Sequence, residues 1–138
     1  MPGRASYMAL ISVTRLRLRS ARFLLAFVWY AIGSALQARG SSGNLGLCLR
    51  KTQGLTFWTL TAWQNVGTMG AFRAGFPHRK AMTKLIYWCD EAAFAHWEQD
   101  SRQLPSWDYA SEQLRKVGHL SKVMYPSQNQ RKGRIVTT

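Results

Sequence analysis

Acidic side chains are missing from the first two thirds of the chain. All six Asp and Glu residues fall between residues 90 and 112, whereas residues 1–89 carry twelve of the 19 Lys and Arg residues. The chain of 138 residues therefore has a net charge of +13, and its amino-terminal part must project a positive field. Such a field favours anionic small molecules, nucleic acid or membrane surfaces as partners, or serves only solubility; it does not define the fold.

Cysteine is also scarce. Cys48 and Cys89 lie in apolar segments without a CxxC or Cys/His spacing, which argues against a disulfide framework and a structural zinc site. We expect both to pack as small hydrophobic side chains in a reducing compartment, the cytoplasm. Glycine-rich phosphate-binding motifs, GxSxG and HExxH are absent as well, so nucleotide, flavin, nicotinamide and zinc-protease functions lose their usual support.

Long hydrophobic runs are limited to one segment, residues 23–36, with the sequence FLLAFVWYAIGSAL. Its 14 residues fall short of the ~20 that span a bilayer. Residues 34–37 at its end, SALQ, form a poor signal-peptide cleavage site. We therefore expect a buried helix, and no membrane partner.

The chain is 46% hydrophobic and 12% aromatic, which is enough for the core of one domain. Apolar periodicity, caps and turns predict a strand, a helix, a hairpin of two strands, two helices, a strand and a last helix, at residues 8–18, 20–37, 45–50 with 55–63, 65–75, 77–89, 92–97 and 106–116. This order is an α+β, ferredoxin-like split βαβ domain over residues 1–125. The basic tail, residues 126–138, is expected to be disordered.

The strand at residues 55–63 carries large apolar side chains on both faces, and the sequence predicts that it is central in the sheet. One layer of helices covers only one of these faces. We therefore expect a homodimer, in which either Trp58 or Trp63, whichever faces away from the helices, anchors the partner.

Two segments carry a resemblance to a known family: TFWTLTAWQNVGTMGAFRAGFPHRKAM from residue 56 and IYWCDEAAFAHW from residue 86. An aromatic strand ending in Trp63, a helix from Val66 to Phe72 and the following His78 resemble the antibiotic-biosynthesis-monooxygenase-like superfamily of dimeric α/β barrels, in a branch near spheroidene monooxygenase. The resemblance implies a homodimer with one pocket in each subunit. It also implies cofactor-independent oxygenation, haem degradation or isomerisation. The strand-one Asn of the haem-degrading members is not evident here.

Two histidines are the candidate catalytic residues. His78 begins an apolar helix stripe with Met82 and Leu85, so its ring should point toward the sheet, where it could transfer a proton or bind a metal. The alternative is a purely structural hydrogen bond. His96 shares a strand face with Phe94 and lies either in the pocket or on the dimer face.

Large side chains on the same elements could line a cavity for a flat ligand, although ordinary core packing explains them equally well. The candidate substrate-binding residues are Trp58, Trp63, Met82, Tyr87 and Trp97.

The leading hypothesis is a monooxygenase-like small-molecule enzyme, acting on an aromatic or polyene substrate without a tightly bound organic cofactor. One alternative is a haem-binding protein with His78 as axial ligand. The other is a non-catalytic basic binding module, for which the runs at residues 15–22 and 79–84 supply the charge. No sequence-specific nucleic-acid motif accompanies these runs.

Overall fold

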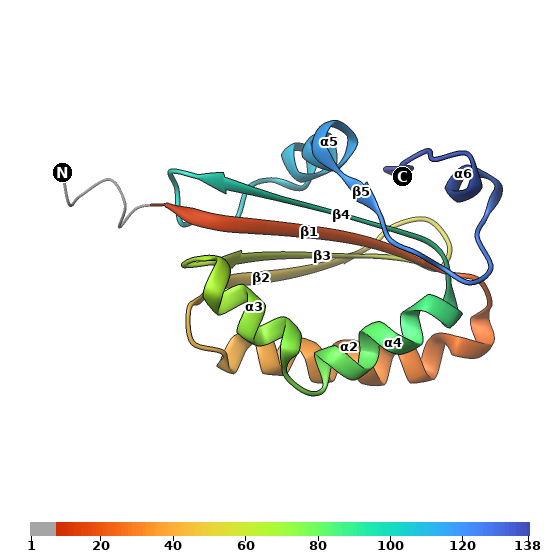
Figure 1. Ribbon diagram of the computed structural model, residues 1–138, viewed down its shortest axis with the longest axis horizontal. Coiled ribbons are helices and arrows are strands. Elements are labelled where there is room, and N and C mark those ends of the chain that lie inside the picture. The colour runs from red at the N-terminus through yellow and green to blue at the C-terminus, as the bar shows by residue number, and fades with distance from the viewer. Residues whose placement is uncertain (1–7) are drawn as a thin grey trace.

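A five-stranded antiparallel sheet lies between two layers of helices in the computed structural model, which describes residues 8–138 (Figure 1). The strand order is β2-β3-β1-β4-β5. The strands are β1 (Ala9–Leu18), β2 (Asn44–Lys51), β3 (Thr56–Trp63), β4 (Cys89–Gln99) and β5 (His119–Leu120). The expected α+β, ferredoxin-like fold is confirmed, but β1 takes the central position that we assigned to the strand at residues 55–63.

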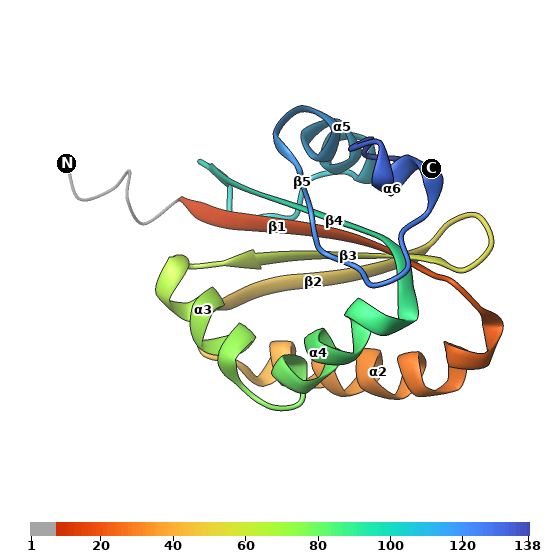
Figure 2. The same cartoon turned by 45° about the vertical axis from the view of Figure 1, so that its right-hand side comes forward.

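The two faces of the sheet are covered by different helices (Figures 1 and 2). One face carries α2 (Leu24–Gly40), α3 (Val66–Ala74) and α4 (His78–Trp88), and the short helix η1 (Ala21–Phe23) leads into α2. The other face carries α5 (Trp107–Val117) and α6 (Gln128–Arg131). The predicted caps are present: the side chains of Ser20, Asn65 and Ser106 each accept a backbone N–H at the start of a helix.

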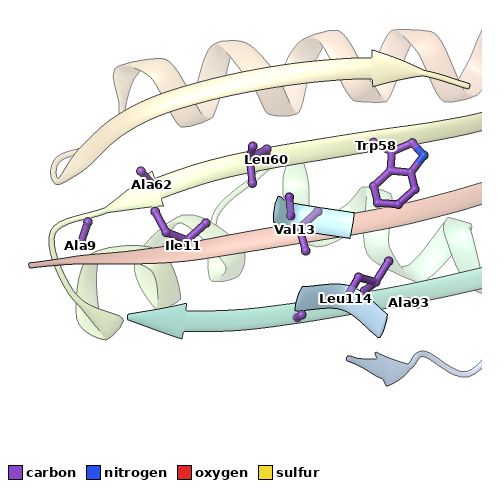
Figure 3. Close-up of a cluster of buried hydrophobic side chains, with 10 residues drawn as sticks. Ala9, Ile11, Val13, Trp58, Leu60, Ala62, Ala93 and Leu114 are labelled. Atoms are coloured by element: carbon purple, nitrogen blue, oxygen red, sulfur yellow. The ribbon is translucent and has the colours of Figure 1, made fainter. Parts of the chain in front are cut away.

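Alternation along β1 assigns its side chains to the two faces. Ile11 and Val13 point toward α5 and belong to a closely packed core with Trp58, Leu60 and Leu114 (Figure 3). Ser12 and Thr14 point to the opposite face, beneath α2 and α4. The sheet therefore has one face filled by large apolar groups and one face with small hydroxyl side chains at its centre.

Helices of the same chain cover the second face of the sheet. An uncovered sheet face is therefore not a reason to expect a dimer. Trp58 is only 1% exposed and meets Trp107 of α5 edge to face, at 6.3 Å between ring centroids. The fully buried Trp63 lies on the other face and stacks on Phe72. Neither Trp is available to anchor a partner, because Trp107 of α5 covers Trp58 and Phe72 of α3 covers Trp63. The homodimer itself stays a prediction.

Asp90 and Glu91 lie inside β4, although the sequence predicted that this strand begins only at residue 92. Arg17 on the neighbouring strand β1 forms two hydrogen bonds of 2.9 Å with Asp90. Arg15 donates to Glu91 at 2.9 Å, with both side chains 4% exposed. Two acidic residues can therefore stand in an interior strand, because the guanidinium groups of β1 neutralise them.

The tail is ordered rather than disordered. Gln130 of α6 donates to the Ser121 carbonyl at 2.7 Å, and the Ser127 hydroxyl donates to Glu91 at 2.7 Å. Ile135 packs against the core beneath α5, and Arg15 donates to the Thr138 carbonyl. The composition of residues 126–138 did not predict these contacts, because most of them are made by polar side chains with partners that are distant in the chain.

The buried pair of Arg15 and Glu91 predicts a pH-dependent stability. Burial favours the neutral form of Glu91, but hydrogen bonds from Ser127 and Arg15 and the charges of Arg17 and Arg15 outweigh it and hold the pKa of Glu91 below its ordinary value. A carboxyl with a lowered pKa stabilises the fold above its unfolded-state pKa, and this stabilisation is lost as the pH falls through the folded-state pKa.

We expect Glu91→Gln to lower the free energy of unfolding at pH 7 by about 3 kcal/mol, because Arg15 is left buried without its charge partner. Urea denaturation of both proteins at pH 7 and pH 3 measures this difference, which should shrink at the lower pH. Glu98→Gln, an exposed position on the same strand, is the control and should change stability by less than about 0.5 kcal/mol. An equal loss for Glu91→Gln at both pH values contradicts the assignment.

Candidate functional site

A cavity of about 440 Å³ lies between the sheet and the layer of α2 and α4. This volume is within the range of about 300–1,000 Å³ that is usual for small-molecule sites. Its sheet side is formed by Ser12, Thr14, Leu16, Leu47, Leu49, Thr59, Thr61, Ala92, Phe94 and His96. Its helix side includes Phe27, Tyr30, Ala31, Ser34 and Ala35 of α2, Phe72 and Arg73 of α3, and His78, Met82, Leu85, Ile86 and Trp88 of α4.

The cavity exists because small residues alternate onto this face of the interior strands. Ser12 and Thr14 of β1 lie beside Thr61 and Thr59 of β3 in the antiparallel register. Ser12 also lies opposite His96 of β4. These side chains are too short to fill the space beneath the helices, so the lining is apolar at its edges with hydroxyl groups at its centre.

His78 is the first residue of α4, and two contacts position it. Its backbone N–H donates to the Gln37 side-chain oxygen at 2.9 Å, while the Gln37 amide nitrogen donates to the Phe72 carbonyl at 2.9 Å. Its ring packs on Phe72, with 4.4 Å between centroids. Gln37 of α2 thus links the end of α3 to the start of α4. The Nδ1 atom of His78 is buried and has no hydrogen-bond partner within residues 8–138.

Both candidate histidines favour the neutral form. Burial lowers the pKa of His78; a hydrogen bond with the Arg73 backbone opposes this, and the charge of Arg73 adds a smaller lowering effect. Burial also lowers the pKa of His96, together with the charges of Arg73 and His119. At pH 7 each imidazole can therefore accept a proton. Arg73 is the positive charge that the two share, and it also lines the cavity.

Three of the residues predicted from sequence meet at the cavity: His78, His96 and Met82. The other predicted substrate-binding residues, Trp58, Trp63, Tyr87 and Trp97, are outside its lining. Trp58 and Trp97 face α5 because they sit one residue away from cavity-facing positions of β3 and β4. Tyr87 instead lies beneath the Arg19 guanidinium, with its ring centroid 4.5 Å away.

Trp88 lines the cavity as its place among the aromatic side chains suggested, but the other aromatic lining residues were not proposed from the sequence: Phe27, Tyr30, Phe72 and Phe94. Phe94 shares a strand face with His96, so alternation along the strand could have identified Phe94 as a lining residue. Tyr30 and Ser34 are one helical turn apart on α2 and therefore lie on the same side of the helix. The sequence alone does not show that this side faces the sheet.

The described residues include no group of three His, Cys, Asp or Glu side chains that could hold a metal ion. For a haem, His78 is the candidate axial ligand, since it is one of the two histidines that line the cavity. Arg73 and Lys122 are the cationic residues of the lining that could pair with carboxylates of such a ligand.

The fold is similar to that of several solved structures. Two are each described as a "putative antibiotic biosynthesis monooxygenase". The one from Deinococcus radiodurans has a TM-score of 0.57 and 20% identity, with 65% of this chain and 91% of that chain covered. The one from Nitrosomonas europaea has a TM-score of 0.60 and 11% identity, with coverage of 68% and 91%.

A protein of unknown function from Nitrosomonas europaea matches with a TM-score of 0.59 and 17% identity, covering 73% of this chain and 98% of its own. No family model and no curated protein matches the sequence. At these identities the likeness shows the fold alone. The chain thus has the fold of the antibiotic-biosynthesis-monooxygenase-like proteins, and the resemblance seen in its sequence is confirmed at that level.

The electrostatics of the site can be tested by NMR titration of the histidine rings. We expect the pKa values of His78 and His96 to lie below the ordinary 6.5. Arg73→Gln should raise both, because it removes a positive charge that disfavours protonation of each ring. Arg79→Gln removes an exposed charge outside the cavity lining and serves as the control. Unchanged pKa values in Arg73→Gln would mean that this charge does not act on the site.

Proposed function

We propose that the protein is a monooxygenase-like enzyme that acts on a flat aromatic or polyene substrate without a tightly bound organic cofactor. The observation that carries this proposal is a pair of buried polar atoms, His78 Nδ1 and Ser34 Oγ, which lack hydrogen-bond partners in the described chain. Both residues line the cavity. Buried polar groups in folded proteins are nearly always paired, so a ligand that bonds to these two atoms would complete the site.

The shape and chemistry of the lining favour a flat, largely apolar ligand. Phe27 and Tyr30 contribute aromatic surface from α2, and Phe94 contributes it from the sheet. Aromatic side chains supply large contact areas with defined geometry, and the few polar groups among them fix the orientation of a ligand.

The proposed reaction begins when the neutral His78 takes a proton from an activated CH₂ group of the substrate. The resulting carbanion is delocalised over the aromatic or polyene system and adds to O₂, which gives a peroxide anion. Protonation yields a hydroperoxide, and loss of water from it leaves a carbonyl group. In total, the CH₂ group and O₂ give C=O and H₂O, with oxygen as the only oxidant.

Positive charge beside the cavity would assist the first step. Arg73 and Lys122 can stabilise the negative charge that develops on the substrate. The net charge of +13 would also steer an acidic or enolate-like substrate toward the protein. The fold supports the proposal, since the two structures from Deinococcus radiodurans and Nitrosomonas europaea carry monooxygenase descriptions.

The test is oxygen consumption with tricyclic hydroxyaromatic compounds that carry a CH₂ group between two rings. We expect one O₂ to be consumed for each carbonyl formed. His78→Gln should lower kcat by about 100-fold or more, because it removes the base and keeps a side chain of similar polarity. His119→Gln is the matched control, since His119 is exposed and outside the lining. No turnover of any such compound, or equal kcat values for both variants, would falsify the proposal.

Haem binding by His78 is the second candidate, favoured by the place of this histidine in a cavity with aromatic side chains. Titration with haem should then produce a Soret band that His78→Ala abolishes and His119→Ala leaves unchanged. No band, or a band that survives His78→Ala, excludes this candidate.

A further inference from the structure

The outer side of α2 is a stripe of exposed apolar side chains, although the sequence predicted a buried helix. Leu25, Trp29, Ile32 and Leu36 are 87%, 78%, 55% and 65% exposed, and Val28 is exposed beside them. Their spacing of three or four residues places them on one side of the helix. Only Phe27 and Ala38 of α2 are buried. The apolar composition of the helix therefore does not reflect burial on all sides.

The inner side of α2 packs within the fold, which favours a helix that stays in place over one that crosses a membrane. Tyr30 and Ser34 line the cavity. At Gly33 a Cβ atom would come within 3.1 Å of the Pro77 ring, which shows how closely α2 approaches the start of α4. By length and composition alone the segment Ala21–Gly40 could span a bilayer. Its contacts instead hold it flat along the edge of the molecule (Figure 1).

The surroundings of this stripe are cationic. Exposed Arg22 and Arg39 flank its two ends, and Arg39 is seven residues after Ile32, which continues the same side of the helix. On the adjacent helix α4, the Lys84 ammonium lies 5.8 Å from the Tyr30 ring centroid, and Lys80 is exposed one turn earlier. No acidic residue occurs before Asp90, and Asp90 is bound by Arg17.

We propose that the outer face of α2 binds an anionic lipid surface, with Leu25, Trp29, Ile32 and Leu36 inserted at the interface and the flanking cations on the lipid phosphates. An apolar helix face edged by Arg and Lys, with a Trp among the apolar residues, is the combination that lies in the plane of a charged bilayer. A second copy of the chain is a poor occupant, because it would bring the same cations against these cations.

This inference goes beyond the proposed function and does not depend on it. It departs from the expectation, drawn from the sequence, of a protein without a membrane partner. The same helix presents Tyr30 and Ser34 to the cavity and Trp29 and Ile32 to the lipid, so an apolar ligand in the bilayer would be only one helix away from the cavity.

The test is co-sedimentation of the full chain with vesicles of phosphatidylcholine alone and of phosphatidylcholine with 30 mol% phosphatidylglycerol. We expect partitioning onto the anionic vesicles that is at least about tenfold stronger and that weakens as salt is raised. The double variant Trp29→Gln with Ile32→Gln should reduce it at least about tenfold, because it removes apolar contact without changing the charge. Both positions are more than half exposed and Gln is a good helix former, so the fold should persist, as circular dichroism can verify.

The matched control is Tyr109→Gln on α5, an exposed apolar residue on the opposite side of the sheet, which should bind like the unaltered protein. His78→Gln should also bind normally, so failure of the enzyme proposal is distinguishable from failure of this one. Three results overturn the inference: no preference for anionic vesicles, equal binding by the double variant, or a dimer by light scattering that the double variant converts to monomer without any vesicle binding.

Discussion

Alternation of side chains along β1 is the constraint on which the rest of the molecule depends. This strand pairs with β3 on one side and β4 on the other, so its register sets which residues of all three strands face each helix layer. Ile11 and Val13 create a filled face against α5, whereas Ser12 and Thr14 create an incompletely filled face against α2 and α4. A shift of one residue would exchange the two sets and remove both the core and the cavity.

The polar end of the same strand joins the amino-terminal and carboxyl-terminal parts of the chain. Arg15 faces the α5 side, where it bonds to Glu91 of β4 and to the carbonyl of Thr138. Ser127 bonds to the same carboxylate. A charge pair at this depth requires such additional hydrogen bonds to offset the loss of water. The order of residues 126–138 follows from this requirement as much as from apolar packing.

The sequence was informative where a signal is local. The caps at Ser20, Asn65 and Ser106, the order of strands and helices along the chain and the inward direction of His78 could all be predicted from spacing. Alternation along the strand also placed Trp58 and Trp63 on opposite faces of the sheet, although both were predicted to bind substrate. What could not be predicted depends on partners distant in the chain: the cover supplied by α5, the bonds of Asp90 and Glu91 to β1, and the side of α2 that faces the sheet.

The separation of charges along the chain becomes a separation in space. The segment that contains every acidic residue forms β4, α5 and their connection, whereas α2 and α4 carry only cationic groups. The layer of α2 and α4 therefore has no acidic group to offset its cations, whereas the layer of α5 and α6 carries both signs, with Arg115, Lys116 and Arg131 beside Asp108 and Glu112. A negatively charged surface attracts the layer of α2 and α4 without an opposing repulsion from acidic groups of that layer. Its approach is thus oriented by the layer that also encloses the cavity.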